Sequence, residues 1–321
     1  MNDVRQRRVA VNGVELEVRE AGDPGAPVVL LAHGFPELSY SWRHQLEPLA
    51  AAGFHVSAPD QRGYGRSSAP QDVSAYGFRE LTGDLIGLLD ETGQEQAVVV
   101  GHDWGAMVAW ATAQLHADRV RSVVGVSVPF VQWPMQPTLL MKAGFGDRFF
   151  YILYFQEVGP AERELDADPH LTMRKFLWSA SADAHRPPPT ELPPMEGTRM
   201  LDLMPELPDE LPAWLSEDDV RTYGESFANS GFFGPVSWYR NLDANFEVLK
   251  DRGPENVSMP SYFITGDLDV VRVMDPGGID RMRSVLPDYR GETIVPEAGH
   301  WVQQERPDEF NDALLAFLKT L

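Results

Sequence analysis

The residues best suited to chemistry in this chain are the pentapeptide GHDWG at 101–105. The apolar run AVVV at 97–100 precedes it and an Ala-rich stretch follows it, a pattern that predicts a buried strand, a sharp turn and a helix. The two flanking glycines allow the backbone to turn sharply. Such a turn holds the residue at its tip above the edge of a sheet, where its side chain can act as a nucleophile. In this chain that residue is Asp103.

An aspartate at this position restricts the reaction. A carboxylate is ionised at pH 7, so it can attack a saturated carbon without the help of a base. Serine would need its proton removed and would form an ether, which water does not cleave. Attack by Asp103 instead forms an ester, and a second step can hydrolyse its carbonyl. The alternative interpretation is that Asp103 only caps the helix that follows it.

A general base for the second step is predicted at His300, in the segment EAGHW at 297–301 that follows the last predicted strand. The order nucleophile, acid and histidine along the chain is that of hydrolases with a strand–turn–helix elbow. The acid should orient His300 and stabilise its imidazolium. Asp267 and Asp269 both follow a predicted strand, and their spacing favours neither.

Backbone N–H groups at Phe35 and Trp104 are candidates for an oxyanion hole. Phe35 lies in the segment HGFP at 33–36, which follows an apolar run and can also be interpreted as an ordinary tight turn. The glycine-rich segment 61–68 lacks the lysine of a phosphate-binding loop. The spacing of histidines and carboxylates matches no metal site. We therefore expect neither a cofactor nor a metal.

The order of predicted elements indicates an α/β fold. A hairpin with an Asn-Gly turn is predicted at the N-terminus, and short apolar strands then alternate with helical patterns. This alternation favours a mostly parallel central sheet with helices on both faces, and a site beyond the carboxyl ends of the strands. The predicted strands cover 8–11, 14–18, 27–32, 54–60, 97–100, 120–128, 261–265 and 291–295, and helices are predicted at 81–89 and 310–321.

The pattern changes after Pro129. Strands are no longer predicted, aromatic residues, Met and Pro accumulate, and eight of the 26 prolines lie between 187 and 212. Segments 148–156 and 171–182 have helical patterns. We expect an inserted, mainly helical cap over 132–245, between two parts of the core at 1–131 and 246–321.

Composition excludes several classes of function. The 321 residues include no cysteine, which excludes disulfides, thiolate metal sites and a cysteine nucleophile. The formal charge of −21 disfavours nucleic acid and anionic membranes as partners. Solubility and salt adaptation both explain such acidity. No apolar run approaches the roughly 20 residues of a membrane span, and no signal-like segment follows the N-terminus. We expect a cytoplasmic protein, a monomer or a homodimer, with a small-molecule substrate.

The motifs of the chain, taken together and in order, resemble those of the soluble epoxide hydrolases of the α/β-hydrolase superfamily. The resemblance covers essentially the whole chain, and the two motifs in the expected cap are its most specific part. The motifs are HGFPE with SWRHQ at 33–45, DQRGYGRSSAP at 60–70, GHDWG at 101–105, LYFQEVG at 153–159, SGFFGPVSWYRN at 230–241 and AGHW at 298–301.

The resemblance implies an α/β-hydrolase fold and a role for several residues. Asp103 matches the nucleophile and His300 the base of that family. Asp269 matches the acid better than Asp267, because it lies four residues after the strand-end Thr265. Phe35 and Trp104 match the oxyanion-hole amides, and Pro36 matches a proline that often follows a cis peptide bond.

The same resemblance implies that Tyr154 and Tyr239 in the cap bind the epoxide oxygen. An opened epoxide leaves as an alkoxide and needs proton donors, which two tyrosines opposite the nucleophile would supply. A halide needs only N–H donors, and Phe35 offers no side-chain donor. We therefore expect hydrolysis of an apolar epoxide to a vicinal diol. The alternatives are a haloalkane or haloacid dehalogenase with the same aspartate, and a catalytically silent binding protein of the same fold.

Overall fold

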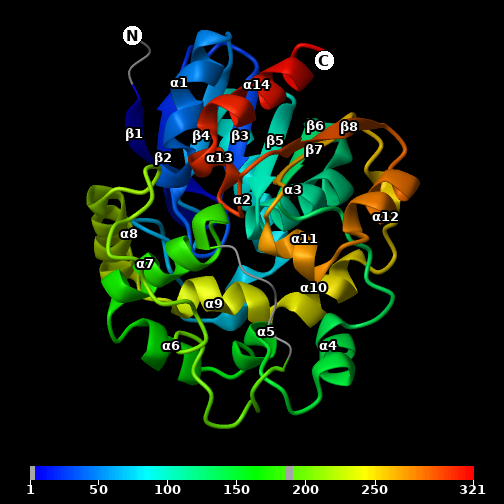
Figure 1. Ribbon diagram of the computed structural model, residues 1–321. Coiled ribbons are helices and arrows are strands. Elements are labelled where there is room, and N and C mark those ends of the chain that lie inside the picture. The colour runs from blue at the N-terminus through cyan, green and yellow to red at the C-terminus, as the bar shows by residue number, and fades with distance from the viewer. Residues whose placement is uncertain (1–3, 185–190) are drawn as a thin grey trace.

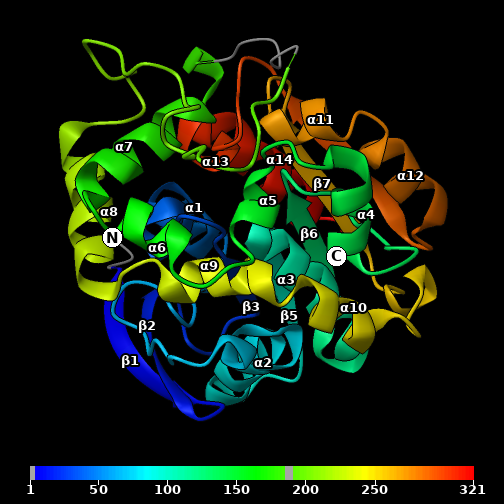
Figure 2. The ribbon, with the colours of Figure 1, turned by 90° about the horizontal axis from the view of Figure 1, so that it is seen from below.

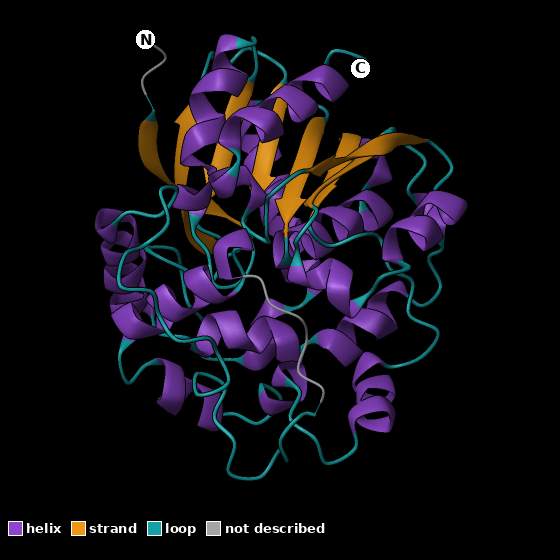
Figure 3. Ribbon diagram, viewed as in Figure 1, coloured by secondary structure: helices purple, strands orange, loops and turns teal. Residues whose placement is uncertain are grey.

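The computed structural model describes residues 4–184 and 191–321, and these form one eight-stranded sheet (Figures 1 and 3). The strand order is β1-β2-β4-β3-β5-β6-β7-β8. Strands β1 and β2 run antiparallel to their neighbours, and the other strands are parallel, as predicted. The strands are β1 (Arg5–Val11), β2 (Val14–Ala21), β3 (Val28–Ala32), β4 (His55–Pro59), β5 (Ala97–His102), β6 (Val120–Val126), β7 (Ser261–Gly266) and β8 (Tyr289–Val295).

The predicted N-terminal hairpin is confirmed. Val11 pairs with Val14 across a two-residue turn formed by Asn12 and Gly13. Both turn residues have positive φ, +47° and +77°, which is the conformation that matches the twist of the two strands.

Helices cover both faces of the sheet, because the central strands are apolar on both sides. In β3, Val29 and Leu31 face one core and Leu30 faces the other. Helices α1 and α14 pack on the first face, and α2 and α3 on the second (Figure 3). The helices of this part are α1 (Arg43–Ala51), α2 (Phe78–Thr92), α3 (Trp104–Leu115), α11 (Val270–Met274), α12 (Gly278–Val285), α13 (Val302–Glu305) and α14 (Pro307–Leu318), with short 3-10 helices at Ser39–Trp42, Val73–Tyr76, Ala117–Arg119 and Pro254–Asn256.

Between β6 and β7 the described chain forms helices, which lie beyond the carboxyl ends of the strands (Figures 1 and 2). In the view from below, α5 and α9 lie across the ends of β3 and β5 (Figure 2). The helices are α4 (Pro137–Phe145), α5 (Tyr151–Tyr154), α6 (Pro160–Leu165), α7 (Pro169–Ser179), α8 (Glu217–Ser230), α9 (Phe233–Arg240) and α10 (Leu242–Leu249), with a 3-10 turn at Ala182–Ala184.

One expectation for this region is adjusted. The helix expected over 148–156 is only the single turn α5, because Phe149 N–H donates to Pro193 O and Phe150 is extended, with φ −138°. Part of the proline-rich stretch 187–212 lies outside the described residues, and its remainder contains no helix. Among the described residues, no helix is both long and apolar enough to cross a membrane.

Candidate active site

The predicted elbow joins β5 to α3, with Asp103 at its tip. Asp103 has φ +53° and ψ −120°, a strained conformation that non-glycine residues rarely adopt. The start of α3 lies so close to the end of the neighbouring strand β3 that a Cβ atom at Gly105 would lie 2.1 Å from Ala32 O, so only glycine fits. The side chain of Asp103 makes no capping hydrogen bond to α3. The capping interpretation therefore fails, and the carboxylate is directed elsewhere.

One carboxylate oxygen of Asp103 lies against the loop that follows β3. Phe35 N–H donates to Asp103 Oδ1 at 2.8 Å. The loop reaches this position because Gly34 has no side chain, since a Cβ atom there would lie 2.4 Å from Asp103 Cβ. The peptide bond between Phe35 and Pro36 is cis, as the resemblance implies. Trp104 is the first residue of α3, and the role of its amide stays a prediction.

His300 lies on the other side of the same carboxylate. Its Nε2 is 3.5 Å from Asp103 Oδ2, and its Nδ1 is 3.0 Å from Asp269 Oδ1. Asp269 is fully buried and also accepts from Val271 N–H at 2.9 Å. Asp267 is exposed and accepts from a backbone N–H instead. Of the two candidate acids, the structure thus brings Asp269 to the histidine.

The electrostatics of this group favour a positive imidazole. Burial lowers the pKa of His300, but the carboxylates of Asp269 and Asp103 outweigh it and hold that pKa well above its ordinary value. Burial raises the pKa of Asp269, but His300 and several hydrogen bonds outweigh burial and keep the pKa below its ordinary value. The resting site is therefore a cation held between two carboxylates.

Two tyrosines of the helical insertion, Tyr151 and Tyr239, lie close enough to Asp103 to be affected by its charge. The ring of Tyr239 lies 5.2 Å from that of Phe35 and 5.0 Å from that of Trp104. Tyr151 is 5.8 Å from Tyr239, ring to ring. Burial raises the pKa of both tyrosines, and the negative charge of Asp103 raises it further. Both hydroxyls therefore keep their protons at neutral pH and can serve as donors.

Tyr154 does not join this group, which corrects the expectation that it pairs with Tyr239. Its hydroxyl donates to Glu164 Oε2 at 2.7 Å, and its ring packs 5.4 Å from that of Phe149. Tyr151 lies one helical turn earlier, in the same aromatic run, and its ring contacts that of Tyr239 instead. Two tyrosines at this spacing cannot be told apart by pattern, because the choice depends on where α5 begins.

A buried network beneath the site was not predicted. His102 contacts Glu37 Oε2 through Nδ1 at 2.5 Å and His300 O through Nε2 at 2.7 Å. Glu37 also accepts from Gly34 N–H at 3.0 Å and from Gln303 at 3.1 Å. Burial raises the pKa of Glu37, but His102 outweighs this effect and lowers the pKa to about 2. The pair links the loop of Phe35 to the loop of His300. In the sequence, Glu37 and His102 were visible as residues of the motifs HGFPE and GHDWG to which no role was assigned.

The described residues contain no group of three or more His, Asp or Glu side chains arranged to hold a metal ion. The side chains and backbone of the site itself offer a carboxylate, a histidine–aspartate pair, backbone donors and two phenols.

The profile of the alpha/beta hydrolase fold family matches residues 27–164. The chain is 49% identical to epoxide hydrolase A of Mycobacterium tuberculosis (strain ATCC 25618 / H37Rv), over 98% of each chain. The crystal structure of epoxide hydrolase A from Mycobacterium thermoresistibile is similar at 45% identity with a TM-score of 0.89, covering 99% of this chain and 98% of that one. An epoxide hydrolase from an endophytic Streptomyces is similar at 37% identity with a TM-score of 0.91, covering 98% and 95%.

Proposed function

Because this chain belongs to the epoxide hydrolase family of the α/β-hydrolase fold, we propose that it opens epoxides through a covalent ester on Asp103. Epoxide hydrolysis as an activity follows from that membership, and the residues that perform it are the proposal. The observation that supports it most directly is that the two oxygens of the Asp103 carboxylate have different contacts. Oδ1 accepts from Phe35 N–H, while Oδ2 faces Nε2 of His300.

In the first step, Asp103 Oδ2 attacks a ring carbon of the epoxide. The carbon–oxygen bond breaks and its electron pair stays on the epoxide oxygen. The hydroxyls of Tyr151 and Tyr239 bind this oxygen, and one of them supplies the proton that converts the alkoxide to an alcohol. Their raised pKa values support the assignment, because such phenols stay protonated until a base as strong as an alkoxide forms.

Formation of the ester prepares His300 for the second step. The resting imidazole carries a proton because two carboxylates surround it. Esterification removes the negative charge of Asp103, so the pKa of His300 falls. The proton of His300 can then replace the one that the tyrosine gave to the alkoxide. The histidine thus becomes a neutral base when a base is needed.

In the second step, His300 takes a proton from water, and the hydroxide attacks the carbonyl carbon of the ester. Negative charge develops on the oxygen held by Phe35 N–H, to which we assign Trp104 N–H as the second donor. Each donor of this kind typically contributes ~3 kcal/mol. Asp269 stabilises the imidazolium, which protonates the departing diol oxygen. The carboxylic acid left on Asp103 returns its proton to His300.

The helices over 132–245 act as the cap in this proposal. They carry Tyr151 on α5 and Tyr239 on α9, across from the strand ends that carry the other groups. The aromatic rings around Phe35 support a small apolar epoxide as the substrate, since the space beside the nucleophile is lined by rings.

A single turnover in ¹⁸O-water tests the mechanism. Enzyme in excess over styrene oxide should place the label in the peptide that contains Asp103 and leave the diol unlabelled, because water attacks the ester carbonyl. The same peptide from enzyme incubated without substrate is the control and should carry no label. Label that enters the diol directly would show attack of water on the epoxide, and the ester mechanism would then be wrong.

A further inference from the structure

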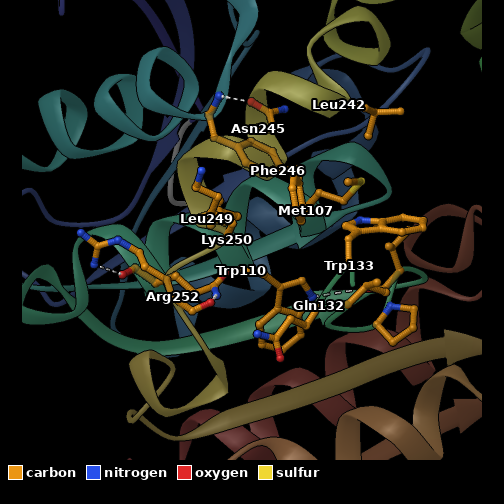
Figure 4. Close-up of a pocket in the computed structure, with 16 residues that line it drawn as sticks. Met107, Trp110, Gln132, Trp133, Leu242, Asn245, Phe246, Leu249, Lys250 and Arg252 are labelled. Carbon is orange, nitrogen blue, oxygen red and sulfur yellow. Dashed lines mark hydrogen bonds between the residues drawn. The ribbon is translucent and has the colours of Figure 1, made fainter. Parts of the chain in front are cut away.

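A cavity lies along the flank of α3, next to the candidate active site but not including Asp103 (Figure 4). Its walls are α3, α10 and the segment 128–133 that follows β6, and its volume is about 120 Å³. Met107, one helical turn after Asp103, is one of the residues that line it. Most of the wall is apolar or aromatic: Phe78, Met107, Trp110, Trp133, Leu242 and Phe246.

One polar side chain in this wall lacks a partner. Asn245 is 2% exposed, and its Oδ1 accepts from Phe78 N–H at 2.7 Å. That bond fixes the orientation of the amide, because the oxygen must face the N–H group. The amide nitrogen then points to the other side (Figure 4), where the described residues offer it no acceptor. A buried donor without a partner is costly, so an acceptor brought by a ligand would be bound favourably.

The charged residues at the cavity are already engaged. Lys250 Nζ lies 2.7 Å from Glu247 Oε2, and Arg252 donates to Gln114 O at 3.0 Å. Neither offers a free charge to a ligand. The wall is mainly apolar, so an ordered water would find few of the two to four polar partners that it requires.

We propose that this cavity is a binding site for an uncharged single-ring molecule that carries one oxygen acceptor. The ring packs against the aromatic wall, and the oxygen accepts from Asn245 Nδ2. The size agrees, since an engineered apolar cavity of about 150 Å³ in another protein takes up benzene. The proposal goes beyond epoxide hydrolysis and requires no turnover, so it stands or fails independently of the mechanism at Asp103.

Acetophenone and ethylbenzene form a matched pair of probes. The two are similar in shape, but only acetophenone carries an acceptor. Binding is measured by calorimetry and by the fluorescence of Trp110 and Trp133, which line the cavity. Native enzyme should bind acetophenone about fivefold more tightly than ethylbenzene, the gain of one neutral hydrogen bond. Equal affinity for the two probes would mean that the amide is not used, and would overturn the proposal.

The variant Asn245→Asp removes the donor and keeps the acceptor for Phe78 N–H. It should bind acetophenone about tenfold more weakly, because two oxygens then face each other, and bind ethylbenzene as the native enzyme does. A second variant, Val131→Trp, places a larger side chain in the cavity wall. Val131 is 40% exposed, so the change should lower the affinity for both probes without disturbing the core.

Melting curves check the fold of both variants. Tyr239→Phe should leave binding unchanged. If acetophenone affinity instead falls in Tyr239→Phe and is unaffected by both cavity variants, the ligand binds at the active site and the proposal is wrong.

Discussion

Oδ2 of Asp103 lies 3.5 Å from Nε2 of His300, while the other oxygen of the same carboxylate is held by a backbone N–H group 2.8 Å away. The two oxygens are therefore not equivalent. One is restrained where an oxyanion would form, and the other is free to form a bond. This asymmetry is what a nucleophile that is later attacked at its own carbonyl requires.

His300→Gln should trap the ester. The first step does not use His300 as a base, so alkylation proceeds, whereas ester hydrolysis should slow by about 10²-fold or more. Mass spectrometry of the intact variant mixed with substrate should show an added mass equal to one substrate molecule. His44→Gln, which changes an exposed histidine, is the control and should show no adduct. Absence of an adduct in His300→Gln with a substrate that the native enzyme turns over rapidly would remove His300 as the hydrolytic base.

Asp103→Asn should lower the pKa of His300. The Asp103 carboxylate stabilises the imidazolium, so its removal favours the neutral ring, and the titration should move to lower pH by roughly one to three pH units. The variant imitates the loss of charge that accompanies ester formation. NMR titration of the histidine ring protons measures the shift, and the exposed His44 in the same spectrum should titrate as before. An unchanged or higher pKa of His300 would contradict the proposed switch from acid to base.

Tyr151→Phe and Tyr154→Phe separate the two tyrosines of α5. Loss of a proton donor to the epoxide oxygen should slow alkylation by about 10²-fold in Tyr151→Phe and in Tyr239→Phe. Tyr154→Phe loses only its hydrogen bond to Glu164 and should change the rate by less than about threefold. Stopped-flow measurement of the alkylation phase tests this order. The reverse order would restore Tyr154 to the active site.

The core of the site could be predicted from the sequence because its signals are local. The apolar strand, the glycines and the aspartate of the elbow are contiguous, and parallel topology brings the strand ends together. Asp269 and His300 each lie in the loop that follows a strand, so the adjacent sequence is enough to predict their position at the edge of the sheet. The antiparallel hairpin was predictable for the same reason, since two adjacent residues, Asn12 and Gly13, determine its turn type.

The rest depends on contacts between residues that are distant in sequence. α5 is a single turn because Phe149 bonds to Pro193, and this start decides which tyrosine faces the nucleophile. Glu37 and His102 meet across 65 positions of the chain. Asn245 meets Phe78 N–H across 167 positions. No periodicity indicates such pairs, so the start of α5 and the buried network were visible only in the structure, whereas the helical insertion itself was predicted.

Glu37→Gln should make the free energy of unfolding less dependent on pH in the acidic range. His102 lowers the pKa of Glu37 to about 2 from an ordinary value of 4.5. The pair therefore stabilises the fold above about pH 4.5, and this contribution is lost as the pH falls toward 2. The difference of about 2.5 pH units corresponds to about 3 kcal/mol at neutral pH. Urea unfolding should find the variant less stable by about that amount at pH 7, with the gap closing between pH 4.5 and 2.5.

Glu47→Gln, a change at an exposed glutamate, is the matched control for this series and should follow the native enzyme at every pH. The sign of the effect distinguishes a charged pair from packing alone. If Glu37 contributed only shape and neutral hydrogen bonds, the difference between the variant and the native enzyme would be the same at pH 3 and pH 7. A constant difference would therefore show that the free energy of the Glu37–His102 contact does not come from its charge.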